Sequence, residues 1–139
     1  MVQILIDNGA DPNKASQWGQ NPVNMAATAG HKDVVQLFLD KGADPNKADM
    51  SGFTPLHRSA LEGHTYVVQL LLEQGAEPNR KTVITQSTPL HWAALMGHLD
   101  VVKLLLDGGA NRSMTDNKGK TSMQYAVREG YSEVIQLLS

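Results

Sequence analysis

Apolar residues along the chain gather in short clusters with helical spacing, separated by polar stretches rich in Gly, Pro and Asn. In the clearest cluster, a Val-Val-x-Leu-Leu-Leu run gives a helix over about 65–73 a broad apolar face. A shorter segment, 56–62, lies between Thr54-Pro55 and Gly63. Threonine caps a helix N-terminus, proline is tolerated in the first turn, and glycine ends a helix at positive φ. The pattern therefore predicts two short helices joined at Gly63.

The same pair of segments recurs with a period of 33 or 34 residues. The recurring phrases are Gly-Ala-acid-Pro-Asn from Gly9, Gly42, Gly75 and, degraded, Gly109; Thr-Pro-Leu-His at 54–57 and 88–91, weaker at 21–24 and 121–124; and Gly-His or Gly-Tyr from Gly30, Gly63, Gly97 and Gly130. One period shared by three phrases indicates stacked copies of a single unit. Because neither helix is long enough to be stable alone, stacking has to bury what one unit leaves exposed.

Each unit is joined to the next by a polar loop that is expected to double back through a turn. The turn sequences are Gln17-Trp18-Gly19, Met50-Ser51-Gly52 and Asn117-Lys118-Gly119. The loop over 80–87 is one residue longer than its counterparts, and Gln86 stands in the place of the turn glycine. Glycine favours turns because it adopts positive φ without steric penalty. This loop is therefore predicted to have a different tip conformation.

Taken together, these phrases resemble the ankyrin repeat, a unit of about 33 residues with a Thr-Pro-Leu-His start. The resemblance covers essentially the whole chain. It implies an all-α solenoid of about four repeats, with helix–turn–helix units and β-hairpin-like loops that project at right angles. The expected units of this single array (1–139) are 1–15 (partial, second helix only), 16–48, 49–81, 82–115 and 116–139 (partial at its end). The resemblance also implies protein binding through the hairpin tips and the first helices, without intrinsic catalysis.

Both ends of the sequence fall inside a second helix. Met1 aligns with Val67, and the segment 134–138 matches 67–71. Repeat arrays normally end in capping units with a polar outer face. We expect either a segment of a longer array, with further repeats or end-to-end contacts, or ends covered by something else. A short protein with frayed ends is the alternative.

Composition narrows the function further. The chain has 12 Lys and Arg against 14 Asp and Glu, a net charge of -2, which argues against a dedicated binder of nucleic acid or anionic membranes. It has no Cys, so disulfides, thiolate zinc sites and a cysteine nucleophile are excluded. No apolar run approaches the roughly 20 residues of a membrane helix, and no signal peptide is visible. We expect an intracellular protein, cytoplasmic or nuclear.

The five histidines invite a metal or catalytic interpretation, but they recur with the repeat. His57 and His91 hold the fourth place of Thr-Pro-Leu-His, where the resemblance implies that the ring ties the helix start to neighbouring backbone. The others follow a helix-ending glycine, and no His-x-x-x-His pair suggests a zinc site. The sequence also lacks a Gly-x-Ser-x-Gly nucleophile turn and a phosphate-binding loop. We therefore expect no metal, no cofactor and no enzyme activity.

The asparagines of the loop phrase leave one question open. Asn79, Asn46 and Asn13 are similar to asparagines that hydroxylases modify in the family. The same asparagines are structural in nearly every repeat. The sequence leaves both interpretations standing.

Residues that the repeat does not require are the candidates for partner binding. They are Trp18, Met50, Phe53, Arg58, Ile84, Trp92, Leu95, Met96, Lys118, Lys120, Tyr125 and Arg128. Aromatic residues, Met and Arg are enriched at protein interfaces, and exposed apolar patches tend to mark them. This set predicts a concave groove with an apolar centre and a cationic C-terminal end, suited to a helix or extended peptide with apolar anchors and an acidic flank.

Exposure is the point on which these candidates differ. Met50, Phe53, Ile84 and Met96 are expected to be exposed. For Trp92 and Tyr125 the alternative is packing between the first helices, and Leu61 and Leu95 are open to partial burial. Two further functions stay open: a structural spacer solenoid, and a substrate-docking region of a larger multidomain protein. A spacer predicts an ordinary solvated surface, which the apolar residues of the third unit speak against.

Overall fold

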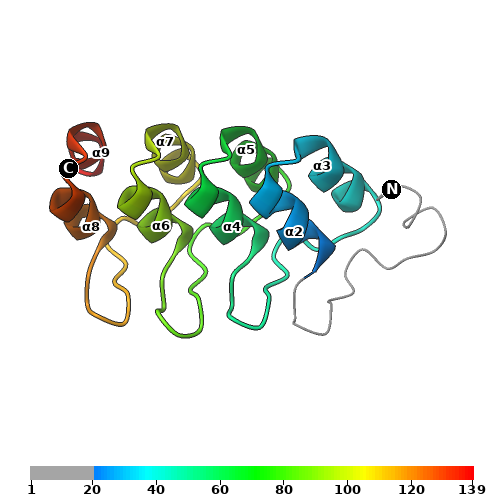
Figure 1. Cartoon of the computed structure of the whole chain (residues 1–139), viewed down its shortest axis with the longest axis horizontal. Coiled ribbons are helices and arrows are strands. Elements are labelled where there is room, and N and C mark those ends of the chain that lie inside the picture. Colours follow the sequence, from blue (N-terminus) through cyan, green and yellow to red (C-terminus); the bar gives the residue numbers. More distant parts are fainter. Residues whose placement is uncertain (1–20) are drawn as a thin grey trace.

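The computed structural model describes residues 21–139, and in this range it consists of eight α-helices arranged as four consecutive pairs. The first helices of the pairs lie side by side in one layer and the second helices in another, with the loops projecting beyond the first layer (Figure 1). The first helices are α2 (Pro22–Ala29), α4 (Pro55–Glu62), α6 (Pro89–Met96) and α8 (Ser122–Glu129). The second helices are α3 (Lys32–Asp40), α5 (Thr65–Glu73), α7 (Leu99–Asp107) and α9 (Ser132–Leu138). The all-α solenoid is thus confirmed, and Trp18 and the partial unit 1–15 lie outside the described residues.

Helix starts and ends follow from the recurring phrases. Thr54, Thr88 and Thr121 each accept a hydrogen bond from the backbone N–H three residues on, and that residue's side chain in turn accepts from the threonine N–H. Gly63 ends α4 with φ 78°, a left-handed conformation in which a side chain would be strained. A Cβ there would also lie 2.6 Å from the His98 ring. The glycine is therefore required both by the turn and by the close approach of the next unit.

The core lies between the two layers and continues from one unit to the next. Leu56, Leu71, Leu90 and Leu105 are fully buried there. Between neighbouring first helices the buried residues are small: Ala27, Ala60, Ala94 and Ala126 are each 0% exposed. Small side chains let the first helices approach closely, so each unit completes the core of its neighbour. No helix among residues 21–139 has the length and apolar character needed to cross a membrane.

The histidines of Thr-Pro-Leu-His hold adjacent units together. The Nδ1 atom of His57 accepts the Thr54 backbone N–H at 3.1 Å, so the ring proton is on Nε2. That Nε2–H donates to the Ser87 and Arg80 carbonyls in the next loop, at 3.1 and 2.9 Å. Burial disfavours the charged imidazolium and lowers the pKa of His57 to about 4. The structural role that the resemblance implied is confirmed, and the ring is neutral at physiological pH.

The histidines after the helix-ending glycine make a second set of links. The Nε2 atom of His64 lies 2.9 Å from the Thr28 carbonyl, and that of His98 lies 3.0 Å from the Leu61 carbonyl. In each bond the ring reaches back to the end of the preceding first helix. The recurrence of these histidines is therefore explained by packing between units.

The loop asparagines link consecutive loops in the same manner. The Asn46 amide donates to the Gly75 carbonyl at 3.1 Å and accepts the Glu77 backbone N–H at 2.7 Å. Asn79 makes the equivalent pair of bonds with the carbonyl of Gly109 and the N–H of Asn111. Both asparagines have a structural role, and Asn13 lies outside the described residues.

The hairpin tips are also joined to one another through their backbones. The Val83 N–H donates to the Ser51 carbonyl, and the Asn117 N–H donates to the Thr85 carbonyl, each at 2.9 Å. The backbone hydrogen bond that closes the third-unit hairpin joins Thr82 and Ser87, whereas the equivalent bond in the second unit joins Asp49 and Phe53. The third-unit hairpin is therefore one residue longer. The predicted difference of this tip is confirmed.

Gln86 takes the backbone conformation of the glycine that it replaces. Its φ is 53°, the one positive φ of a non-glycine residue among residues 21–139. Glycine is found at positive φ in the equivalent place of the neighbouring hairpins, at Gly52 and Gly119. The positive φ of this position is therefore kept, although the sequence signal for it is lost and the hairpin tip is longer.

Candidate functional site

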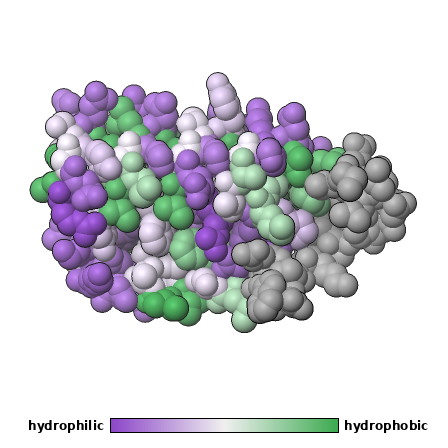
Figure 2. Space-filling model, viewed as in Figure 1, coloured by the Kyte–Doolittle hydropathy of each residue, from purple (hydrophilic) through white to green (hydrophobic). Residues whose placement is uncertain are grey.

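Exposed apolar side chains occur at the hairpin tips and on the first-helix layer. Met50, Val83 and Ile84 at the tips are 74%, 64% and 76% exposed, and Met96 at the end of α6 is 47% exposed. Apolar surface is visible along the hairpin edge of the molecule in Figure 2. The expected exposure of Met50, Ile84 and Met96 is confirmed. Val83 was not among the candidates, although it precedes Ile84 in the longest loop.

Phe53 is half-buried, so the expectation that it is exposed is wrong. Its ring lies 5.5 Å from the Trp92 ring and 5.7 Å from the His57 ring, measured between centroids. The Arg58 guanidinium covers it at 4.2 Å and forms an ion pair of 2.6 Å with Asp49. The loop returns to the helix start just before Thr54, which directs the Phe53 side chain into the space between α4 and α6.

Trp92 and Tyr125 are also half-buried, as the alternative interpretation allowed. Trp92 packs on Phe53, and its Nε1 atom is buried without a hydrogen-bond partner among the described residues. The Tyr125 hydroxyl donates to Asp116, and the ring meets the His91 ring edge-on at 6.1 Å. Both side chains are thus oriented by their neighbours while one face of each remains open.

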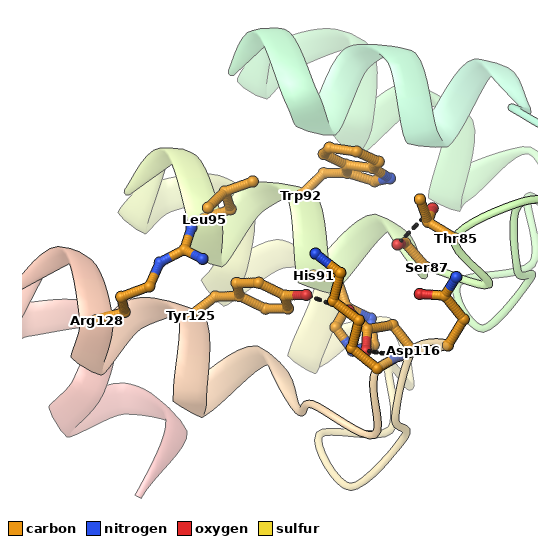
Figure 3. A pocket seen from close by; sticks show the side chains of 10 residues that line it. Thr85, Ser87, His91, Trp92, Leu95, Asp116, Tyr125 and Arg128 are labelled. Atoms are coloured by element: carbon orange, nitrogen blue, oxygen red, sulfur yellow. Dashed lines mark hydrogen bonds between the residues drawn. The ribbon is translucent and has the colours of Figure 1, made fainter.

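These two aromatic side chains form the walls of a groove between α6 and α8. The groove has a volume of about 210 Å³ (Figure 3). Trp92 and Leu95 line it from α6, Tyr125 and Arg128 from α8, and Lys118 from the hairpin. The Arg128 side chain points toward Leu95 (Figure 3). Five of the predicted binding residues therefore meet in one place, which we call the α6/α8 groove.

The other predicted residues lie outside the α6/α8 groove. Met50 and Ile84 are at the hairpin tips, and Phe53 and Arg58 lie one unit toward the N-terminus. The Lys120 carbonyl accepts a hydrogen bond from the His91 ring at 2.9 Å. The surface is therefore a groove with separate apolar tips rather than one continuous apolar patch.

Asp116 lies at the floor of the groove and was missed by the sequence analysis. It is buried, and one oxygen accepts the backbone N–H groups of Lys118 and Lys120 at 2.9 and 3.0 Å. Burial alone would raise the pKa of Asp116, but the Tyr125 hydroxyl and these backbone donors outweigh it and hold the pKa below its usual value. The signal that could have found it is its position in the hairpin, which matches Asp49.

The groove floor also contains His91, whose ring is neutral. Burial lowers the pKa of His91, as it does for His57. The hydrogen bond to Asp116, followed by burial, raises the pKa of Tyr125. At neutral pH the floor therefore holds one carboxylate whose hydrogen bonds are to the chain itself, and the other charged residues that line the groove are the cations Lys118 and Arg128.

A second groove lies between α2 and α4, the first two first-layer helices of the described chain. It is lined by Asn24, Met25, Thr28, Asp49 and Arg58. Arg58, the cation of this groove, differs from the cations of the α6/α8 groove because it already forms an ion pair with Asp49. No group of three or more His, Asp or Glu side chains in residues 21–139 has the arrangement of a metal site.

Comparison with known proteins agrees with this architecture. A family model described as ankyrin repeats, comprising three copies of the unit, matches residues 1–82 and 79–139. No curated protein matches the chain. The sequence phrases, the paired helices and the family match therefore point to the same repeat.

Proposed function

Because this chain belongs to the ankyrin-repeat family, we propose that it binds a protein partner through its first-helix surface and its hairpin tips. Ankyrin repeats are in general non-enzymatic modules of protein–protein interaction. The observation that carries the proposal is the exposure of Ile84 and Met96, at 76% and 47%, next in the sequence to Thr85 and Leu95, which line the α6/α8 groove. Exposed apolar side chains near a polar rim are typical of interaction sites.

The chain is proposed to have no catalytic activity of its own. Both ring nitrogens of His57 and of His91 are engaged in hydrogen bonds that hold the fold. The Asp116 carboxylate is likewise occupied by Tyr125 and two backbone N–H groups. These groups support packing between units, so they are not available as acids or bases.

Replacement of Met96 by Glu tests the proposed surface. Partners captured with the wild-type chain are purified, and their affinities for wild type and variants are measured by calorimetry. Met96→Glu is expected to weaken binding by roughly 1–3 kcal/mol, as for an interface anchor. Thermal unfolding should change little, because the side chain is exposed.

Tyr66→Glu is the matched control, because Tyr66 is 70% exposed on α5 in the layer of second helices. It should leave the affinity unchanged. An equal loss of affinity for both variants would contradict the proposed surface. So would a Met96→Glu variant that binds as tightly as the wild-type chain.

A spacer solenoid is the second candidate, and the links between loops favour it. Asn46 and Asn79 each bridge to the following loop, which stiffens the array. A spacer needs no partner, so no protein would be retained by the wild-type chain. If the wild-type chain instead retained a protein that is the substrate of a catalytic domain, the array would be a substrate-docking region of a larger protein.

A further inference from the structure

We propose that the α6/α8 groove recognises an acidic segment of the partner protein, with an apolar side chain inserted between Trp92 and Tyr125. Carboxylates on either side of that apolar side chain would pair with Lys118 at the hairpin end and Arg128 at the opposite end. The inference rests on the proposed function, because it specifies the chemistry of the partner at the same surface.

The cations of this groove are not neutralised by its own acid. In the α2/α4 groove, Asp49 forms an ion pair of 2.6 Å with Arg58. In the α6/α8 groove the equivalent acid, Asp116, is taken by the Tyr125 hydroxyl and two backbone N–H groups. A tyrosine, Tyr125, stands here at the position equivalent to Arg58. Because Asp116 is bound by this tyrosine, the cations at the rim of the groove are left to pair with a ligand.

The rim cations make only weak interactions with charged groups of the described chain. Arg128 lies 3.5 Å from Glu129, and the two side chains are 54% and 38% exposed. Exposed ion pairs contribute little, so this contact is easily exchanged for one with a ligand. The guanidinium also lies 5.2 Å from the centre of the Tyr125 ring, which keeps it at the groove wall. Lys118 forms no ion pair with any residue of the described chain.

The layer of second helices and the α6/α8 groove differ in charge. The second helices carry two cations, Lys32 and Lys103, against six acids, Asp33, Asp40, Glu73, Asp100, Asp107 and Glu133. The α6/α8 groove is instead lined by two cations, Lys118 and Arg128, and by one acid, the buried Asp116. An acidic segment is therefore attracted to the groove and repelled from the opposite layer.

The walls of the groove suit a single apolar side chain. Trp92, Leu95 and Tyr125 give the groove apolar sides, and its volume of about 210 Å³ suits one side chain. The burial of an apolar anchor supplies affinity, and the carboxylates supply selectivity.

The test uses three pools of fluorescent decapeptides, each with a fixed central Leu. The residues two places to either side of this Leu are Glu in the first pool, Gln in the second and Lys in the third. All other positions are drawn from Ala, Ser and Gly. Fluorescence anisotropy measures binding to the full chain and to Lys118→Gln and Arg128→Gln. The matched control is Lys103→Gln, an exposed lysine on α7.

The Glu pool is expected to bind at least fivefold more tightly than the Gln pool, and the Lys pool more weakly than either. Lys118→Gln and Arg128→Gln should each weaken the Glu pool roughly fivefold, and the control should not. The preference should shrink as salt is raised. Equal binding of the Glu and Gln pools, with both weakened by Trp92→Ala, would overturn acid recognition but leave protein binding standing.

Two other results would overturn the proposal. If none of the pools binds, neither the acidic segment nor protein binding at this groove is upheld. An oligothymidine of 20 nucleotides is included because Trp92 and Tyr125 are side chains on which bases can stack. If it binds more tightly than the Glu pool, and Arg128→Gln weakens it, the ligand is a nucleic acid.

Discussion

Neutral, buried His57 makes the array sensitive to acid, and His57→Gln measures how much. The side chain is 0% exposed, and burial lowers its pKa from 6.5 to about 4. In the unfolded chain the imidazole regains its ordinary pKa. Between these two pKa values the unfolded state binds a proton that the folded state refuses.

The direction and the size of the effect follow from this difference. Because the unfolded state binds more protons in this range, the free energy of unfolding falls as the pH is lowered from about 6.5 to about 4. The contribution is complete above pH 6.5 and fully lost below pH 4. A difference of about 2.5 pKa units corresponds to about 3 kcal/mol at 1.36 kcal/mol for each unit. His91, whose pKa is also lowered by burial, acts in the same direction.

Glutamine is the suitable replacement because the fourth unit already uses it. At the equivalent position, the Gln124 oxygen accepts the Thr121 backbone N–H at 2.8 Å, as the His57 ring accepts that of Thr54. Urea unfolding followed by circular dichroism at pH 7 and pH 4 gives the stability of both proteins. His57→Gln is expected to lose about 3 kcal/mol less than the wild-type chain between these pH values. Equal losses in the two proteins would refute the reasoning.

The glycine positions give two further predictions, each checked by urea unfolding at pH 7. Gly63→Ala should destabilise the chain by at least about 1 kcal/mol more than Gly119→Ala, because both have positive φ but only at Gly63 does a Cβ meet the His98 ring at 2.6 Å. Equal effects would mean that the ring moves aside freely. Gln86→Gly should raise the free energy of unfolding by up to about 1 kcal/mol, because it removes a left-handed side-chain conformation; a loss of stability would show that Gln86 makes a stabilising contact.

The helices could be predicted from the sequence because their signals are local. Thr54, Pro55 and Gly63 fix the two ends of α4 by capping and positive φ, and these effects act within one turn. The observed bounds of α5, Thr65–Glu73, agree with the apolar face read from the Val-Val-x-Leu-Leu-Leu run. Signals of this kind need no knowledge of neighbouring units.

The site was less predictable because its geometry depends on contacts between units. The burial of the Phe53 side chain depends on packing against the Trp92 ring, 39 positions later in the chain. The role of Asp116 depends on whether residue 125 is a tyrosine or an arginine, a difference that changes which charges reach the surface. Such pairings follow from the stacking distance of the units, which the repeat period does not specify.

The backbone bonds between the hairpin tips have a consequence for the thermodynamics of binding. Because Ser51 accepts from Val83, and Thr85 accepts from Asn117, no tip among these three hairpins is anchored by its own unit alone. Loops that are already held in place lose little conformational entropy when a ligand orders them. A ligand seated on the tips should therefore show a small entropic penalty, unlike ligands of free loops.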